Sequence, residues 1–195
     1  DYVEIGSFVA AAALTGGELT VNGVVAEHLR PVALTFGKLG VGFTVENGVL
    51  RLPARRALRV THDHGFAVPR IEDGIWPSFP SDLMSVAVVM AVRAAGTVIF
   101  YEKLFESRLY FVDRLIEMGA RIVQCDPHRV VVVGPSRLHG LRLASPDIRA
   151  GMALILAALC AKGESVIENA QCVDRGYERI DEKLRALGSE IRRDE

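Results

Sequence analysis

The sequence predicts an α/β fold built from three copies of one βαβαββ unit in cyclic order, and three repeated signals predict it. In each copy an apolar helical pattern begins at an aspartate and stops at a glycine, the residue that favours a left-handed helix cap. A run rich in β-branched residues follows. A second, more polar amphipathic helix then ends in an apolar residue and a glycine. We expect a single domain over residues 1–195, with copies at about 1–70, 71–141 and 142–195.

In each of the first two copies the sequence pattern locates both helices and three of the four strands of the unit. In the first copy these are a helix from Asp1 to Gly16–Gly17, a strand within Glu18–Val25, a helix ending at Leu39–Gly40 and two strands within Phe43–Leu52 that turn at Asn47–Gly48. In the second they are a helix from Asp82 to Gly96, a strand over Thr97–Tyr101, a helix ending at Met118–Gly119 and two strands within Ile122–Val133 that turn at Asp126–Pro127–His128. Both turns have the composition that hairpins favour.

The third copy is shorter than the other two. Its expected elements are a helix from Asp147 to Gly163, a strand over Glu164–Glu168 and a helix ending at Leu187–Gly188. The first of these helices has a strong start signal, with Ser145 as N-cap, Pro146 at the first helical position and Asp147 in the first turn. The pattern stops near Ile191, so we expect strands from elsewhere in a parent chain to complete this copy.

Composition excludes several classes of protein. Half of the 195 residues are hydrophobic, about a quarter are charged and the formal charge is −1. This balance is typical of a soluble globular protein and not of a disordered or fibrous one. It gives no overall attraction for nucleic acid or for an anionic membrane. Any anion site must therefore come from a local cluster of arginines.

The cysteines and the apolar runs favour a reduced, cytoplasmic compartment. Cys125, Cys160 and Cys172 share no metal-binding spacing and do not form an even set. The longest apolar runs, such as Ala153–Ala161, are far shorter than the roughly 20 residues of a membrane helix. We find no signal peptide. Because the chain begins at Asp1 inside an apparent helix, we expect it to be a fragment.

Two helix starts combine aspartate with groups that bind anions. Helix N-termini expose unpaired N–H groups and the positive end of the helix dipole. Asp82 and Asp147 either cap their helices only, or one of them also acts as a base. Arg149 stands two residues into a first turn, where its charge opposes the dipole at a cost of about half a kcal/mol. That placement is equally consistent with an anion-binding role and with none.

Two further arginines occupy equivalent places in their copies. Arg108 and Arg175 are expected near the starts of the second helices. They either belong to solvated helix faces or converge with Arg149 around a pseudo-threefold axis. Guanidinium groups grip carboxylates and phosphates through two parallel hydrogen bonds, so convergence would predict a small polyanion as the ligand.

Several motifs together resemble the UDP-N-acetylglucosamine enolpyruvyl transferase (1-carboxyvinyltransferase) family. They are Phe79-Pro80-Ser81-Asp82, Phe105-Glu106-Ser107-Arg108, Asp147-Ile148-Arg149-Ala150, Asp174-Arg175-Gly176-Tyr177-Glu178-Arg179-Ile180 and Glu182-Lys183-Leu184-Arg185-Ala186-Leu187-Gly188. The similarity extends over nearly the whole chain and is weakest over residues 53–75. It implies an inside-out α/β barrel, with helices within and sheets facing solvent. It also implies that the chain is the C-terminal-half domain, whose last strands come from the N-terminus of the parent protein.

The resemblance implies a reaction that neither domain performs alone. The enolpyruvyl group of phosphoenolpyruvate would pass to the 3-hydroxyl of UDP-N-acetylglucosamine with release of phosphate, the first committed step of peptidoglycan precursor synthesis. No cofactor and no metal are implied. A partner domain would supply a mobile loop with a reactive cysteine, a phosphate-binding lysine and a further arginine. We therefore expect the isolated chain to be inactive.

The resemblance also implies a role for each candidate residue. Asp82 would be the general base, and Arg108 and Arg149 would hold the carboxylate of phosphoenolpyruvate. Arg175 would stabilise charge that develops in the tetrahedral intermediate. Asp147 would orient nearby arginines. The amino-sugar pocket would be lined by Ser81, Leu104 and Phe105.

Three positions depart from the family pattern. Ser107 stands where asparagine is usual, Cys172 where histidine is common and Ser81 where most relatives have threonine. None of these changes removes a proposed catalytic group.

Three other functions compete with this one. A shikimate-phosphate enolpyruvyl transferase would have an acidic residue in place of Phe105. A non-catalytic binding module would keep the barrel without the chemistry. A metal enzyme is suggested by His62 and His64, which would alternate on one strand face, but no third ligand accompanies them.

Overall fold

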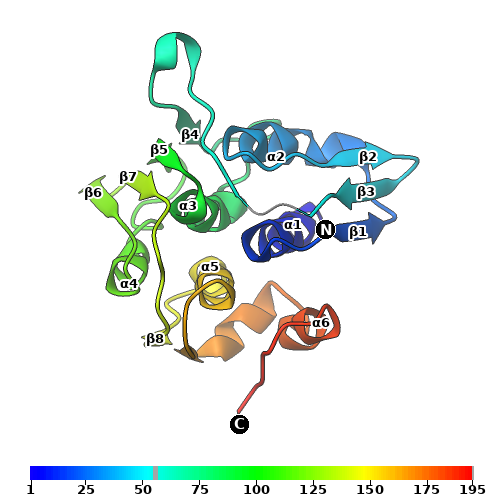
Figure 1. Ribbon diagram of the computed structural model, residues 1–195, viewed down its shortest axis with the longest axis vertical. Coiled ribbons are helices and arrows are strands. Elements are labelled where there is room, and N and C mark those ends of the chain that lie inside the picture. Colours follow the sequence, from blue (N-terminus) through cyan, green and yellow to red (C-terminus); the bar gives the residue numbers. More distant parts are fainter. Residues whose placement is uncertain (55–56, 195) are drawn as a thin grey trace.

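Three apolar helices form the centre of the molecule. In the computed structural model, which describes residues 1–54 and 57–194, helices α1 (Tyr2–Thr15), α3 (Met84–Arg93) and α5 (Ile148–Leu159) pack against one another. Figure 1 shows them nearly end-on, with the sheets and the other helices around them. Every residue from Met84 to Val92 is buried. A helix that is apolar on all sides is stable only in such a position.

Three small sheets surround these helices. The first has the order β1 (Leu19–Asn22), β3 (Val49–Leu52), β2 (Thr44–Glu46), and the second has the order β4 (Arg70–Glu72), β5 (Gly96–Tyr101), β7 (Arg129–Gly134), β6 (Ile122–Asp126). The third contains β8 (Arg142–Ala144) and β9 (Val166–Glu168). The predicted unit includes a strand before each central helix, but the positions of β4 and β8 were not located in the sequence. Both are three residues long, which leaves little β-periodicity to detect.

Two of the sheets contain a parallel crossover around a central helix. Strands β4 and β5 run parallel with α3 between them, and β8 and β9 run parallel with α5 between them. Strand β5 has a neighbour on both sides, namely β4 and β7. Its counterparts β1 and β9 are each paired on one side only among the described residues.

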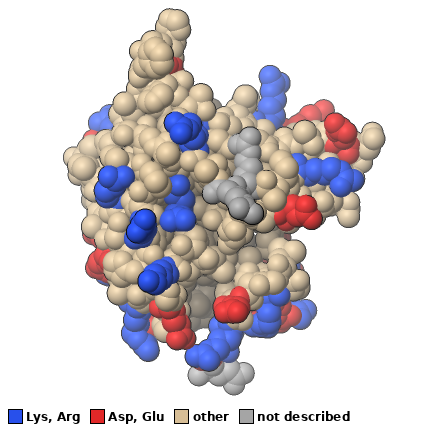
Figure 2. Space-filling model, in the orientation of Figure 1, with Lys and Arg blue, Asp and Glu red and all other residues tan. Residues whose placement is uncertain are grey.

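The remaining helices are short or amphipathic. They are α2 (Ala26–Lys38), α4 (Val112–Glu117) and α6 (Ile180–Ala186), with 3-10 turns η1 (His64–Phe66), η2 (Ser81–Leu83) and η3 (Ala170–Arg175). Residues 61–68, which include η1, project from the body at the top of Figure 1. In Figure 2 this projection carries almost no charge, while basic and acidic side chains are scattered over the face below it.

Most of the predicted turns and caps are confirmed. Asp1 caps α1 by accepting hydrogen bonds from the backbone of Val3 and Glu4, and Gly16 ends the helix in the left-handed conformation. Asn47 and Gly48, at φ 51° and 74°, form the hairpin turn between β2 and β3. Both values lie in the left-handed region that this kind of turn requires.

Two predicted helix boundaries were wrong. Helix α3 ends at Arg93, because Ala94 leaves it in an extended conformation that needs no glycine cap. Gly96 instead begins β5, where an added Cβ would lie 2.8 Å from the Cβ of Val60. Helix α5 ends at Leu159, four residues before Gly163.

The predicted start of α5 also needs correction. Asp147 is the N-cap, and its Oδ1 accepts hydrogen bonds from the backbone N–H groups of Arg149 at 2.7 Å and Ala150 at 2.8 Å. Ser145 is not the cap, because its hydroxyl donates to the carbonyl of Asp147. A carboxylate at the cap also interacts favourably with the helix dipole.

The strand predicted to carry two histidines is absent. His62 lies in irregular chain and His64 begins η1, so the two side chains do not share a strand face. In the part of the chain that the structure describes, no three His, Cys, Asp or Glu side chains are grouped as a metal site would require. Nor does any described helix have the length and apolar character needed to cross a membrane.

Candidate functional site

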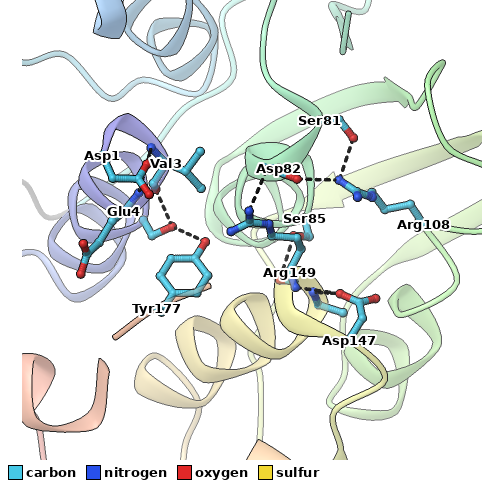
Figure 3. A network of polar contacts seen from close by, with 12 residues as sticks. Asp1, Val3, Glu4, Ser81, Asp82, Ser85, Arg108, Asp147, Arg149 and Tyr177 are labelled. Carbon is cyan, nitrogen blue, oxygen red and sulfur yellow. Dashed lines mark hydrogen bonds and ion pairs between the residues drawn. The ribbon is translucent and has the colours of Figure 1, made fainter. Parts of the chain in front are cut away.

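The starts of α3 and α5 meet at one end of the three central helices. The guanidinium Nη2 of Arg149, from the first turn of α5, lies 2.7 Å from Oδ2 of Asp82, which precedes α3. The Ser85 hydroxyl donates a hydrogen bond to the backbone carbonyl of Arg149 at 3.0 Å. Residues far apart in the sequence thus form one polar cluster, as Figure 3 shows.

Asp82 is the centre of this cluster because each of its carboxylate oxygens pairs with a different arginine. Arg108 donates from Nη1 to Oδ1 of Asp82 at 3.0 Å, and Arg149 occupies Oδ2. The Asp82 side chain is 38% exposed, and each arginine side chain is 21% exposed. Two cations share one anion, so the cluster carries a local positive charge within reach of solvent. Such a cluster can bind an anionic ligand.

Aromatic rings support both guanidinium groups. The Arg108 guanidinium lies 4.2 Å from the centre of the Phe105 ring, and that of Arg149 lies 5.5 Å from the centre of the Tyr177 ring. Tyr177 is buried, and its hydroxyl lies 3.0 Å from the Ser7 hydroxyl on α1. Burial is the main cause that raises the pKa of Tyr177. The rings add cation–π attraction and restrict where each guanidinium can lie.

A buried polar layer lies beneath Arg108. Nη1 of Arg108 donates to the hydroxyl of Ser81 at 2.9 Å, and that hydroxyl donates to Oε1 of Glu102 at 2.8 Å. Ser81 and Glu102 are both buried, and Glu102 has no exposed surface. Burial, with the neighbouring Asp73 carboxyl, raises the pKa of Glu102 to about 8. Glu102 is therefore largely protonated at neutral pH.

This buried layer was missed by the sequence analysis. Glu102 is followed by Lys103 and reads as one of a solvated pair at a strand end. The signal for its burial is the alternation along β5. Val98 and Phe100 are fully buried, and Glu102, directly after the strand, continues the same alternation. Tyr177 belongs to one of the motifs quoted above, but nothing in the sequence indicates that its ring lies against the Arg149 guanidinium.

The structure brings together some of the predicted site residues and separates others. Ser81, Asp82, Arg108 and Arg149 form one network. Arg175 is exposed at the end of η3, and no described residue hydrogen-bonds or ion-pairs with its side chain. Of the three arginines that could converge, Arg108 and Arg149 meet at Asp82. Leu104 and Phe105 are 44% and 49% exposed beside Arg108, where a ligand can reach them.

The local structure around two arginines differs from the prediction. Arg108 lies in the turn before α4, which begins at Val112, and Arg175 precedes α6 by five residues. Neither arginine is at the start of an α-helix. Asp147 accepts a hydrogen bond from the backbone N–H of Arg149, and among the described residues its carboxylate pairs with no guanidinium group.

The structure shows the surroundings of two residues that depart from the family pattern, Ser107 and Cys172. Ser107 adopts φ 63°, in the left-handed region, where asparagine is favoured over serine. Cys172 places its sulfur 3.3 Å from the Ser145 hydroxyl, beneath the start of α5. Neither residue contacts Asp82, so their departure from the usual pattern leaves the central ion pairs in place.

Replacement of Glu102 with glutamine is expected to change how stability depends on pH. The folded pKa of about 8 lies above the ordinary value of 4.5, so between these values folding binds a proton. Wild-type stability should therefore fall as pH rises from 5 to 8, by at most about 1.4 kcal/mol for each pH unit relative to Glu102→Gln. Urea unfolding at several pH values measures this difference. Glu117→Gln, at an exposed glutamate of α4, is the control and should follow the wild-type curve.

Comparison with known proteins gives consistent results over nearly the whole chain. A family model described as EPSP synthase (3-phosphoshikimate 1-carboxyvinyltransferase) matches residues 1–184. Curated proteins named UDP-N-acetylglucosamine 1-carboxyvinyltransferase are similar, at 50% identity over 191 residues for Treponema denticola and 51% over 193 residues for Bradyrhizobium diazoefficiens. These matches cover 98% and 99% of this chain but 45% of each relative, so the chain spans about half the length of the curated relatives it matches.

Solved structures give the same architecture. The enolpyruvyl transferase NikO from Streptomyces tendae superposes with a TM-score of 0.85 at 26% identity, over 98% of this chain and 44% of that one. EPSP synthase from Acinetobacter baumannii superposes with a TM-score of 0.70 over 98% of this chain and 46% of that one. At 18% identity, the second likeness concerns the fold alone.

Proposed function

The chain belongs to the EPSP synthase family of enolpyruvyl transferases, and from this premise we propose that it is the C-terminal-half domain of a UDP-N-acetylglucosamine enolpyruvyl transferase. The full-length protein would move the enolpyruvyl group of phosphoenolpyruvate to the sugar 3-hydroxyl and release phosphate. The observation that carries the proposal is the pairing of Asp82 with both Arg108 and Arg149 in a partly exposed cluster. In the cell, the reaction would open peptidoglycan precursor synthesis in the cytoplasm.

Two observations favour an amino-sugar acceptor over shikimate phosphate. Relatives that are about half identical to this chain carry the name of the amino-sugar enzyme. At the position where an acid would indicate the shikimate enzyme, this chain has Phe105, whose ring lies against the Arg108 guanidinium. An apolar, half-exposed ring suits a sugar pocket better than the binding of a second charged group.

The cluster supplies the polar groups that the transfer requires. Arg108 and Arg149 already bind one carboxylate, that of Asp82, and would hold the carboxylate of phosphoenolpyruvate in the same way. Asp82 would accept the proton of the sugar hydroxyl as the hydroxyl oxygen bonds to C2 of phosphoenolpyruvate, while C3 gains a proton from an acid of the proposed second domain. Loss of a proton from C3 would then restore the double bond as the C2–O bond to phosphate breaks. The exposed Arg175 would stabilise negative charge as the intermediate forms and phosphate leaves. Asp147 would support this arrangement by holding the start of α5 in place.

The proposed architecture extends beyond the helices and sheets described above. We propose an inside-out barrel of three βαβαββ repeats, at about residues 1–70, 71–141 and 142–195, which a second domain closes over the substrates. The packing of α1, α3 and α5 within the three sheets supports it. The second domain would contribute the loop cysteine, the lysine and the additional arginine.

Phosphate release by the isolated chain and by the full-length protein tests the proposal. With phosphoenolpyruvate and UDP-N-acetylglucosamine, we expect turnover by the full-length protein and none by the isolated chain, because the chain lacks the proposed partner groups. Substitution of shikimate 3-phosphate for the sugar nucleotide should abolish release. Turnover by the pure chain, or a preference of the full-length protein for shikimate 3-phosphate, would contradict the proposal.

A further inference from the structure

Two buried carboxyl groups lie directly beneath the arginine cluster. Asp73 follows β4 and Glu102 follows β5, and neither has any exposed surface. Buried acidic side chains are rare, and they usually have partners that account for their position. Asp73 has such partners, since its Oδ1 accepts from the backbone N–H of Lys103 at 2.5 Å and its Oδ2 from that of Leu104 at 3.3 Å.

Glu102 is only partly satisfied by its surroundings. Its Oε1 accepts a hydrogen bond from Ser81, whereas Oε2 meets no donor among the described residues. After burial, the neighbouring Asp73 carboxyl is the next cause that raises the pKa of Glu102. A carboxylate in this position would leave one buried oxygen unpaired beside another acid, which is costly. A carboxylic acid removes that cost, because the proton on Glu102 can be donated to Asp73.

The two acids contact both parts of the proposed substrate site. Glu102 fixes the hydroxyl of Ser81, and that hydroxyl accepts a hydrogen bond from Arg108. Asp73 accepts a hydrogen bond from the backbone N–H of Leu104 and so holds in place the segment that contains Leu104 and Phe105. The two buried acids therefore connect the guanidinium group that would hold a carboxylate with the chain segment that would line the sugar pocket.

We propose that protonated Glu102 is a positioning residue for this site, and that loss of its proton weakens the binding of a substrate carboxylate at Arg108. Ionised Glu102 would leave the buried pair with two negative charges. The Arg108 guanidinium, 2.9 Å from the Ser81 hydroxyl, would then be drawn toward the pair and away from the ligand. This inference rests on the proposed function for the identity of the ligand, phosphoenolpyruvate.

The other charged groups around Glu102 come from several elements. From the turn between β6 and β7, the His128 Nδ1 lies 2.8 Å from the Glu102 backbone carbonyl. Lys103 extends to Glu72 of β4, with Nζ 3.4 Å from Oε1. Asp82 is connected to Glu102 through two side chains. Arg108 hydrogen-bonds to both Asp82 and Ser81, and Ser81 hydrogen-bonds to Glu102. Because the His128 ring contacts the Glu102 backbone, a His128→Gln variant must accompany the test.

The pH dependence of kcat/KM for phosphoenolpyruvate, measured with the full-length protein from pH 6 to 10, is the central experiment. The wild type should lose about tenfold between pH 7 and pH 9, because kcat/KM reports ionisations of the free enzyme. Glu102→Gln keeps both an acceptor for Ser81 and a donor for Asp73, and should hold kcat/KM within about twofold over the same interval. Glu102→Ala should raise KM for phosphoenolpyruvate at pH 7, a loss that glutamine rescues. His128→Gln should keep the wild-type profile.

A second readout separates this inference from the proposed function. A carbon-13 NMR titration of the Glu102 side-chain carboxyl, assigned by its disappearance in Glu102→Gln, should show a transition near pH 8 whether or not the protein turns over. If the wild type shows no turnover with these substrates, the proposed function fails while the titration still tests the state of the acid. The same alkaline loss in Glu102→Gln as in the wild type, or a carboxyl transition near pH 4–5, would overturn the inference.

Discussion

Asp82→Asn in the full-length protein is expected to lower kcat by about 10³-fold, with affinity for UDP-N-acetylglucosamine within about threefold of wild type. Asparagine keeps the size of the side chain and one acceptor oxygen, but it cannot take a proton from the sugar hydroxyl. Arg108 and Arg149 also lose the anion that now pairs with both of them. Their attraction for the carboxylate of phosphoenolpyruvate should therefore not decrease. The predicted defect lies in the chemical step.

Steady-state kinetics and calorimetric titration of the sugar nucleotide together check this result. Asp113→Asn is the control, because Asp113 is an exposed carboxylate in the first turn of α4 and its replacement should leave kcat unchanged. Near-normal kcat in Asp82→Asn would show that Asp82 only neutralises the arginines. Loss of sugar affinity by a factor of 100 would show that it binds the acceptor and is not the base.

Arg149→Lys is expected to raise KM for phosphoenolpyruvate by about 30- to 100-fold, the second-largest effect. Lysine keeps the positive charge but lacks the planar fork that can bind two carboxylate oxygens. It would also lose the position over the Tyr177 ring that holds the guanidinium group. This rise in KM corresponds to a loss of about 2–3 kcal/mol of binding free energy, which is the contribution of one well-oriented charge-assisted hydrogen bond.

Initial rates at varied phosphoenolpyruvate concentration, with the sugar nucleotide saturating, measure this effect. The control is Arg142→Lys, since Arg142 pairs with Glu168 on the exposed sheet formed by β8 and β9 and should tolerate the change. If Arg149→Lys left KM unchanged and lowered only kcat, Arg149 would act in the transition state and not in substrate binding.

The central network could be predicted from sequence because its members stand at helix starts or in specific motifs. Asp82 and Arg149 stand at helix starts, where a capping role and a role in anion binding were both possible from the sequence. The contact between them depends on how α3 and α5 pack, and no local pattern in the sequence encodes that contact. The expectation of a shared axis for the repeats concerned the convergence of the arginines and did not include this contact.

The buried acids show where local reasoning failed. Asp73 and Glu102 resemble surface residues when read along the chain, since each is next to one charged residue, Glu72 and Lys103 respectively. Their burial follows from the parallel pairing of β4 with β5, and β4 itself was too short to be predicted. The N-cap of α5 was assigned to Ser145 for a related reason: serine and aspartate two residues apart are both good caps, and only the fold decides between them.

The single-sided pairing of β1 and β9 has a consequence for any work with this chain in isolation. A strand edge without a neighbour offers a row of free backbone donors and acceptors, which is a template for another extended chain. Edge strands in separate sheets of one molecule permit growth in more than one direction, and hence self-association that has no relation to catalysis. Co-expression with segments that cover these edges would protect the solubility of the domain.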